Sequence, residues 1–140
     1  MAYINKAITD DWATPKALFD EWNNKYSFKL DAAASQSNHL CDNWFGLDHP
    51  DEAKRDGLTA NWNDYGKVWC NPPYGRGISN WVDKAFYCNN LVVMLLPDRT
   101  DTKWFHQILD NGCQIEFIKG RLKFGDGKNS APFPSLIAII

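Results

Sequence analysis

The alternation of short apolar runs with amphipathic stretches is the feature that most limits how this chain can fold. Strand-like segments at residues 67–71 and 91–95 hold continuous apolar runs, VWC and LVVML, which are typical of strands buried on both faces. Apolar residues recur at helical spacing in three further stretches: residues 14–25, residues 78–87, and the segment between Asp101 and Gly112. Strands that alternate with amphipathic helices predict an α/β fold, with a mostly parallel sheet covered by helices on both faces.

Cap and turn residues predict where the remaining elements begin. We expect Thr14 to cap the first helix, with Pro15 at its first position. Ser79 and Asp101 are the expected caps of the next two helices. Further strands are expected at residues 28–32, 114–118, 121–124 and 136–140, and residues 35–65 are interpreted as turns and loop. The last two strands are close in sequence and can pair antiparallel at one edge.

Length and composition are those of one ordinary globular domain. The chain has 140 residues, of which 44% are hydrophobic and 23% charged, so we expect a single domain over residues 1–140. The longest apolar run, residues 91–96, is far shorter than the roughly 20 residues that span a bilayer. The first thirty residues hold no secretory signal pattern, which favours the cytoplasm.

The cysteines and histidines do not form a recognisable metal motif. The four cysteines include no CxxC pair, and we expect reduced, mostly buried thiols. His39, Cys41 and His49 match no standard spacing of zinc ligands, so no metal site is predicted.

Charge is distributed unevenly although the net charge is only −2. Residues 31–64 hold seven acidic and two basic side chains, whereas residues 119–128 hold four basic side chains and one acidic. A basic stretch of this kind can meet phosphates, although an ordinary solvated surface gives the same pattern.

The tetrapeptide Asn71, Pro72, Pro73 and Tyr74 follows a buried strand directly and precedes a helix. Two consecutive prolines stiffen the backbone at the sheet edge where ligands of such folds bind. The side-chain carbonyl of Asn71 and the backbone carbonyl of Pro72 can accept hydrogen bonds from one planar amino group, while the Tyr74 ring can stack. The pattern therefore indicates a site for an aromatic amine, the alternative being a plain turn.

Two acceptors of this kind suit the transfer of a group to an amine. The lone pair of an aromatic amine is delocalised into the ring, so the amine is a poor nucleophile. Acceptors that hold its hydrogens favour the pyramidal geometry that develops in the transition state. Alignment of two bound reactants can lower the barrier by roughly 7–11 kcal/mol.

Six segments, taken in order, resemble the phage-type adenine-specific DNA methyltransferases of the Dam family. They read TPKALFD, LDAAAS, DGLTANW, VWCNPPYGRGISNWVDKA, VVMLLPDRTDTKWFH and GRLKFGDGKNSAPFPS, and the resemblance covers roughly residues 14–140. The resemblance implies a Rossmann-like class I methyltransferase fold, S-adenosylmethionine as methyl donor and the N6 amine of adenine in double-stranded DNA as acceptor.

The resemblance also implies roles for individual residues. Asn71 to Tyr74 match the catalytic motif, in which Asn71 and Pro72 hold the amine and Tyr74 stacks on the flipped base. The expected cofactor-binding residues are Thr14 and Pro15 at the methionine end, Asp31 at the ammonium group, Ala33 and Ser35 in the close loop, and Asp56 at the adenine or ribose. Thr14 is equally suited to be only a helix cap, and Asp48 rivals Asp56 for the ribose.

The residues expected to contact DNA lie on loops or helix starts near the proposed cleft. They are Arg76, Arg99, Lys103, Arg121 and Lys128 as phosphate contacts, with Phe133 as the second wall of the base pocket or, alternatively, a core residue.

Two departures from the wider methyltransferase pattern leave other interpretations open. Alanines replace the usual glycine-rich loop, and we expect no separate target-recognition domain, so specificity would come from loops or from a second subunit in a homodimer. The alternatives are methylation of a protein glutamine or another planar amine, and a non-catalytic DNA-binding or decoy module with the same fold.

Overall fold

The computed structural model describes residues 13–125, 127–128 and 130–140. Its elements, in chain order, are α2 (Lys16–Tyr26), β1 (Leu30–Asp31), β2 (Asn43–Trp44), a 3₁₀ turn (Glu52–Lys54), β3 (Val68–Cys70), α3 (Ile78–Tyr87), β4 (Val92–Pro97), α4 (Lys103–Asp110), β5 (Gln114–Phe117) and β6 (Ser135–Ile139). Among these described residues, no helix is both long enough and apolar enough to cross a membrane.

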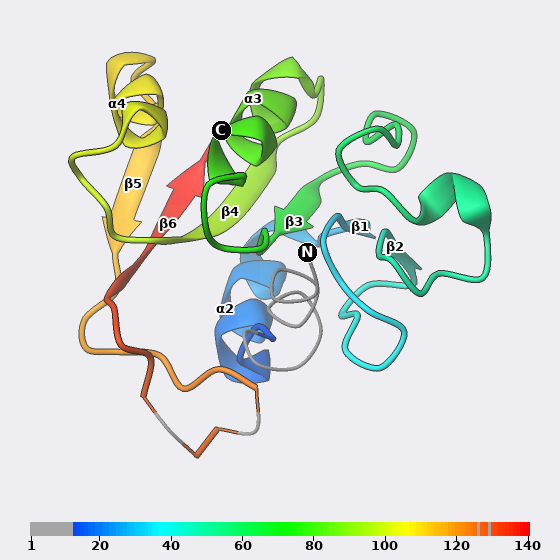
Figure 1. Cartoon of the computed structure of the whole chain (residues 1–140), viewed down its shortest axis with the longest axis horizontal. Helices are drawn as coiled ribbons and strands as arrows, with labels where there is room; N and C mark the ends of the chain where they lie inside the picture. The colour runs from blue at the N-terminus through cyan, green and yellow to red at the C-terminus, as the bar shows by residue number, and fades with distance from the viewer. Residues whose placement is uncertain (1–12, 126, 129) are drawn as a thin grey trace.

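One six-stranded sheet organises the molecule, in the order β2-β1-β3-β4-β6-β5. Strands β2, β1, β3 and β4 pair in parallel, and β6 runs antiparallel to both of its neighbours, β4 and β5. This arrangement confirms the predicted α/β class with a mostly parallel sheet and antiparallel C-terminal strands. Because parallel strands end at the same edge, the residues that follow β1, β3 and β4 meet there (Figure 1).

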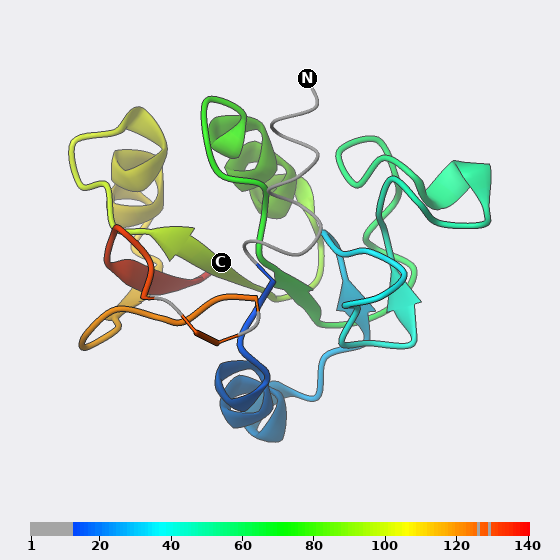
Figure 2. The same ribbon diagram turned by 60° about the horizontal axis from the view of Figure 1, so that its bottom comes forward.

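Helices cover both faces of the sheet. Figure 2 shows α2 below the sheet, with α3 and α4 above it. Phe19 and Trp22 of α2 pack with Trp69 of β3 on one face, while Trp81 of α3 and Ile108 of α4 pack on the other. The six residues of β4 are all buried, which agrees with their continuous apolar sequence. Burial of each such Val or Leu side chain stabilises the fold by roughly 1.5–3 kcal/mol.

Apolar spacing predicts the helices well, but all three predicted caps, Thr14, Ser79 and Asp101, are wrong. Helix α3 has Gly77 at its N-cap, because Ser79 already lies inside the first turn. Helix α4 is capped by Thr102, whose hydroxyl accepts a hydrogen bond from the backbone N–H of Phe105 at 3.2 Å. Asp101 lies one residue too early to reach this N–H.

Two strand predictions also differ from the structure. Residues 121–124 form no strand, because Leu122 pairs with Ala131 inside a loop and Phe124 is buried against the α2 face. Strand β2 lies in the region interpreted as loop, and two residues are too few to produce a periodic pattern. Leu109, one of the apolar residues of this helix, is 49% exposed near the end of α4.

The segment Ala32 to Ala34 follows β1 and is called the alanine loop. Two glycines allow neighbouring loops to pack closely against it. A Cβ atom at Gly57 would lie 2.5 Å from the carbonyl oxygen of Ala32 and 2.6 Å from the Trp81 ring. A Cβ atom at Gly46 would overlap the carbonyl oxygen of Ala34. The close approach that a glycine-rich loop would supply here therefore comes from glycines on the opposing segments.

We predict that Gly46→Ala and Gly57→Ala each lower the free energy of unfolding by about 2 kcal/mol or more, because backbone atoms must move to admit the methyl group. Gly77→Ala is the matched control, since a Cβ there meets nothing within 4 Å and its φ is −80°. Urea unfolding measures all three variants. Equal stability of the Gly46 and Gly77 variants would contradict the packing described.

Candidate active site

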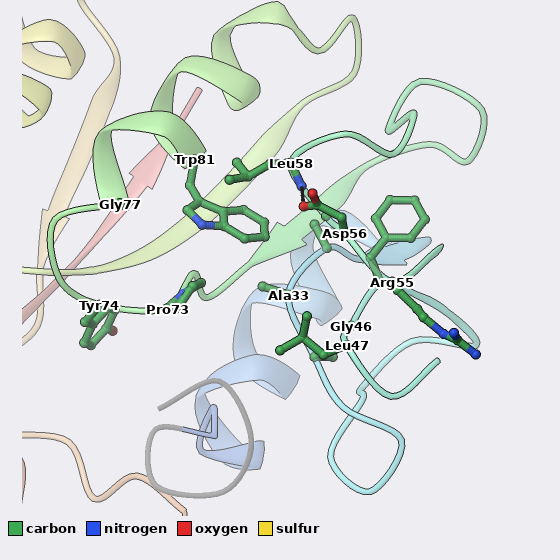
Figure 3. A pocket seen from close by; sticks show the side chains of 14 residues that line it. Ala33, Gly46, Leu47, Arg55, Asp56, Leu58, Pro73, Tyr74, Gly77 and Trp81 are labelled. Atoms are coloured by element: carbon green, nitrogen blue, oxygen red, sulfur yellow. Dashed lines mark hydrogen bonds between the residues drawn. The ribbon is translucent and has the colours of Figure 1, made fainter. Parts of the chain in front are cut away.

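A cavity of about 240 Å³ lies beside the segments that follow β1 and β3 (Figure 3). Four segments line it: Ala32, Ala33 and Ala34; Phe45, Gly46 and Leu47; Arg55, Asp56, Gly57 and Leu58; and Pro73, Tyr74, Gly77 and Trp81. The alanine loop (Ala32 to Ala34) and the second half of the proline corner (Asn71 to Tyr74) thus lie on the wall of one cavity, although about 40 residues separate them along the chain. Asn71 and Pro72 precede the lining residues Pro73 and Tyr74 and do not line the cavity themselves. Most of the lining side chains are apolar, as in sites that take a flat organic ligand.

Two of the predicted cofactor residues line this cavity. They are Ala33 and Asp56. Asp31 and Ser35 do not line the cavity, but they flank the lining residues Ala32 to Ala34 in the sequence. The Asp56 carboxylate accepts a hydrogen bond from the N–H of Leu58 at 2.9 Å, which holds it at the cavity wall (Figure 3). Its rival Asp48 accepts a hydrogen bond from the N–H of Gln36 and is not a lining residue. The geometry therefore favours Asp56 over Asp48 as the polar group of this cavity.

Asp31 is a buried carboxyl group at the end of β1. Only 3% of the residue is exposed, and the side chain accepts a hydrogen bond from the N–H of Leu40 at 3.0 Å. Burial raises the pKa of Asp31 from 3.8 to about 7, although hydrogen bonds from Leu40 and Ala33 oppose this rise. Neither ion pair found among the described residues involves Asp31. A cation bound beside this carboxyl group would favour its ionised form.

Ser35, also buried, serves the loop that follows. Its backbone N–H donates to the side-chain oxygen of Asn38 at 2.7 Å, and its hydroxyl lies 3.2 Å from that of Ser37. These contacts stabilise the turn after the alanines. A direct contact of Ser35 with a cofactor stays a prediction.

The proline corner begins where β3 leaves the sheet. Asn71 is half-buried, and its side-chain N–H group donates to the hydroxyl oxygen of Thr14 at 3.1 Å. Pro72 is buried, while Pro73 and Tyr74 face the cavity (Figure 3). No regular hydrogen bonding continues the strand past Cys70. The corner is therefore rigid through proline geometry rather than through sheet pairing.

Tyr74 separates two cavities. It also lines a second one, of about 120 Å³, together with Arg99, Thr102 and Trp104. Burial is the main cause that raises the pKa of the Tyr74 hydroxyl well above its usual value, and the nearby Cys70 adds to it. The phenol therefore stays uncharged at neutral pH.

Two phenylalanines support the Tyr74 ring. Phe133 packs edge to face against it with ring centres 5.2 Å apart, and Phe124 does so at 6.1 Å. Phe133 lines neither cavity, so its expected role as the facing wall of a base pocket stays a prediction. Phe124 was not expected at the site, because its segment was interpreted as a strand.

Thr14 and Pro15 lie at the start of α2, beside the proline corner. Pro15 occupies the N-cap position, and no side chain caps the helix, so the interpretation of Thr14 as a helix cap is wrong. The Thr14 hydroxyl instead accepts hydrogen bonds from Asn71 and from the indole N–H of Trp69. Neither Thr14 nor Pro15 lines the larger cavity.

All five basic side chains expected to contact phosphates are exposed: Arg76, Arg99, Lys103, Arg121 and Lys128. Arg99 lines the second cavity beside Tyr74. Arg121 and Lys128 flank Phe124, in the loop whose Gly125 N–H donates to the backbone carbonyl of Ala13. This hydrogen bond connects the loop around residues 121–128, called the basic loop, to Ala13, the residue just before Thr14. Asp126 and Asn129, also in this loop, lie outside the described residues.

Several lining residues of the larger cavity could not be identified from sequence. Trp81 has the helical spacing of a core residue and is 7% exposed, yet it also forms a cavity wall. Leu47 and Leu58 carry no pattern that would mark them. Gly57 could have been identified as a turn residue, because an Asp-Gly pair is typical of tight turns.

Comparison with known proteins identifies the family of this chain. The family model described as DNA N-6-adenine-methyltransferase (Dam) matches residues 2–135. A DNA N-6-adenine-methyltransferase of Escherichia phage T1 is 32% identical over 120 residues, which cover 83% of this chain and 48% of that protein. A DNA N-6-adenine-methyltransferase of Haemophilus phage HP1 is 30% identical over 118 residues, covering 81% of this chain and 64% of that protein.

The chain thus spans about half to two thirds of the length of these curated relatives. The family match itself covers nearly all of the chain and includes the alanine loop, the proline corner and the segment of Asp56. The chain therefore belongs to the Dam family of DNA N-6-adenine methyltransferases.

Proposed function

We propose that this chain transfers a methyl group from S-adenosylmethionine to the N6 amine of adenine in double-stranded DNA. The observation that carries the proposal is the position of the Asn71 to Tyr74 corner, which joins the wall of the larger cavity to a second cavity beyond Tyr74. The larger cavity is the proposed donor site and the second the proposed entry of the base. We also propose that the chain acts in the cytoplasm, where host DNA lies, and that it forms a homodimer.

The residues around the larger cavity fit S-adenosylmethionine. Asp31 is a buried carboxyl group with a raised pKa. A cation beside it would favour its ionised form, and the donor carries an ammonium group. Asp56 offers a carboxylate to ribose hydroxyls, and Trp81 and Leu58 offer apolar walls to an adenine ring. When bound, the donor supplies a methyl group activated by a positively charged sulfur.

The corner residues are proposed to hold and activate the acceptor. The Asn71 amide oxygen and the Pro72 carbonyl accept the two N6 hydrogens, which turns the nitrogen lone pair out of conjugation with the ring. Held in this way, the nitrogen lone pair would be directed at the methyl group that a bound donor would supply, with the electrons of the methyl–sulfur bond left on sulfur. The extra proton on nitrogen leaves afterwards to water, so no ionised base is needed beforehand.

The base must leave the duplex to reach this corner, at a cost of a few kcal/mol. Stacking on Tyr74 would return roughly 1–3 kcal/mol. The exposed basic side chains, among them Arg99 at the second cavity and Arg121 in the basic loop, would bind the phosphates of the distorted strand.

We predict that the protein, incubated with methyl-labelled donor and DNA, yields labelled N6-methyladenine after digestion to nucleosides. DNA without adenine is the control. Label in protein glutamine and none in DNA would support the glutamine methyltransferase instead. Absence of both label and donor binding would support the non-catalytic decoy.

Asn71→Ala should lower the single-turnover rate at least tenfold, because one of the two acceptors of the amine is lost, a loss worth about 1.4 kcal/mol or more. Donor affinity, measured by calorimetry, should stay nearly unchanged. Asn80→Ala, an exposed position on α3, is the matched control and should act like the wild type. An Asn71→Ala variant with the wild-type rate would rule out this role.

The raised pKa of Asp31 predicts a pH-dependent stability cost. Between about pH 4 and pH 7 the unfolded chain has released the Asp31 proton and the folded chain keeps it, so this group makes the fold less stable as pH rises. Asp31→Asn removes this cost. Its stability relative to wild type should increase by about 2 kcal/mol from pH 5 to pH 8, measured by urea unfolding. An identical difference at both pH values would contradict the buried carboxyl group.

Asp31→Asn should also weaken donor binding, since the ionised carboxylate is the proposed partner of the ammonium group. Wild-type affinity should rise as pH increases from about 5.5 to 7, because the carboxyl group ionises on binding. The variant should lack this pH dependence. Unchanged affinity in the variant would remove Asp31 from the donor site.

A further inference from the structure

The Thr14 hydroxyl connects the start of α2 to the residue that begins the proline corner. Its oxygen accepts a hydrogen bond from the Asn71 side-chain nitrogen at 3.1 Å and from the Trp69 indole nitrogen at 3.3 Å. Thr14 lies 57 positions from Asn71 in the sequence. The contact is therefore made by the tertiary fold and not by local chain geometry.

The hydroxyl oxygen is held firmly in place. Trp69 is fully buried in β3, and Phe19 of α2 packs against its ring edge to face at 5.5 Å. An indole N–H can only donate, so it fixes an acceptor at the position of the Thr14 oxygen. On the preceding residue, the carbonyl of Ala13 accepts a hydrogen bond from Gly125 at 3.1 Å. Strand, helix start and basic loop together position this one oxygen.

A fixed acceptor at this position determines how the Asn71 amide is turned. The planar amide has its nitrogen on one arm and its oxygen on the other, so a nitrogen directed at Thr14 directs the oxygen away from it. Rotation of the amide by half a turn would exchange the two arms and present donors to an amino group that needs an acceptor. The free energy of one hydrogen bond is enough to bias this choice about tenfold.

We propose that Thr14 is a positioning residue: its hydroxyl oxygen, anchored by Trp69, orients the Asn71 amide so that the amide oxygen faces the amino group to be methylated. The inference rests on the proposed function of Asn71. It differs from the donor contact expected for Thr14 and from the helix-cap role that the structure contradicts.

Kinetics of two Thr14 variants test the proposal. Thr14→Val keeps the shape of the side chain but removes the acceptor, and Thr14→Ser keeps the acceptor. With donor and DNA saturating, the single-turnover rate should fall about five- to tenfold in the valine variant and at most about twofold in the serine variant. Donor affinity should match the wild type in both variants. The thermal unfolding midpoint should match the wild type in Thr14→Ser and fall in Thr14→Val, because the buried indole N–H of Trp69 loses its acceptor there.

A double-mutant cycle separates positioning from a direct role. Thr14→Val should cause no further loss of rate in an Asn71→Ala background, because the hydroxyl acts only through the Asn71 amide. An equal loss in both backgrounds, a wild-type rate in Thr14→Val, or a loss confined to donor affinity would each overturn the proposal.

A spectroscopic measurement checks the same contact without activity. In ¹H–¹⁵N spectra of the free protein, Thr14→Val should shift the indole N–H of Trp69 upfield and alter the side-chain amide pair of Asn71, while Thr14→Ser should leave both near their wild-type positions. Unchanged resonances in Thr14→Val would contradict the hydrogen bonds. If Thr14→Val causes these shifts but the wild-type protein methylates no DNA, the hydrogen bonds are confirmed and the proposed function has failed.

Discussion

The central physical constraint in this molecule is the burial of β3 between helices on both faces of a parallel sheet. Val68, Trp69 and Cys70 are fully buried, so the strand cannot shift without exposing large side chains. Asn71 follows at once, and the prolines after it prevent the chain from continuing as a strand. The position of the corner is thus set by core packing, and its shape by proline geometry. The cavity, the Thr14 contact and the support of Tyr74 all depend on this placement.

Asp31 lowers the stability of the fold near neutral pH, a cost that the proposed binding of the donor's ammonium group would offset. A carboxyl group at the end of β1 is buried by the loops around it, and backbone N–H groups only partly offset the loss of water. A fold selected for stability alone would place an apolar residue or an amide there. The alanines that follow, packed under Gly46 and Gly57, bring the backbone close to the cavity without any glycine of their own. A close approach of the backbone to the cavity and a buried carboxyl group, whose ionised form a cation would stabilise, thus lie next to each other in the chain.

Sequence patterns predicted what depends on periodicity and failed where single contacts decide. The helices and buried strands follow from apolar spacing, and the proline corner from its own four residues. The roles of Thr14 and Phe124 could not be predicted, because each depends on a contact between segments far apart in the chain, with Asn71 and Tyr74 respectively. Strand β2 was missed because two residues carry no period. The residues at 121–124 have strand-like composition, but among the described residues their backbone pairing is with their own loop.

The central claim is that the proline corner holds an amino group beside a donor in the larger cavity. A crystal structure with S-adenosylhomocysteine, the donor without its methyl group, together with an adenine-containing DNA tests it most directly. The account predicts the ligand between the alanine loop and Trp81, its ammonium group at Asp31, and an adenine amine within hydrogen-bond distance of the Asn71 side-chain oxygen. A ligand bound elsewhere, or an adenine that contacts neither Asn71 nor Tyr74, would contradict it.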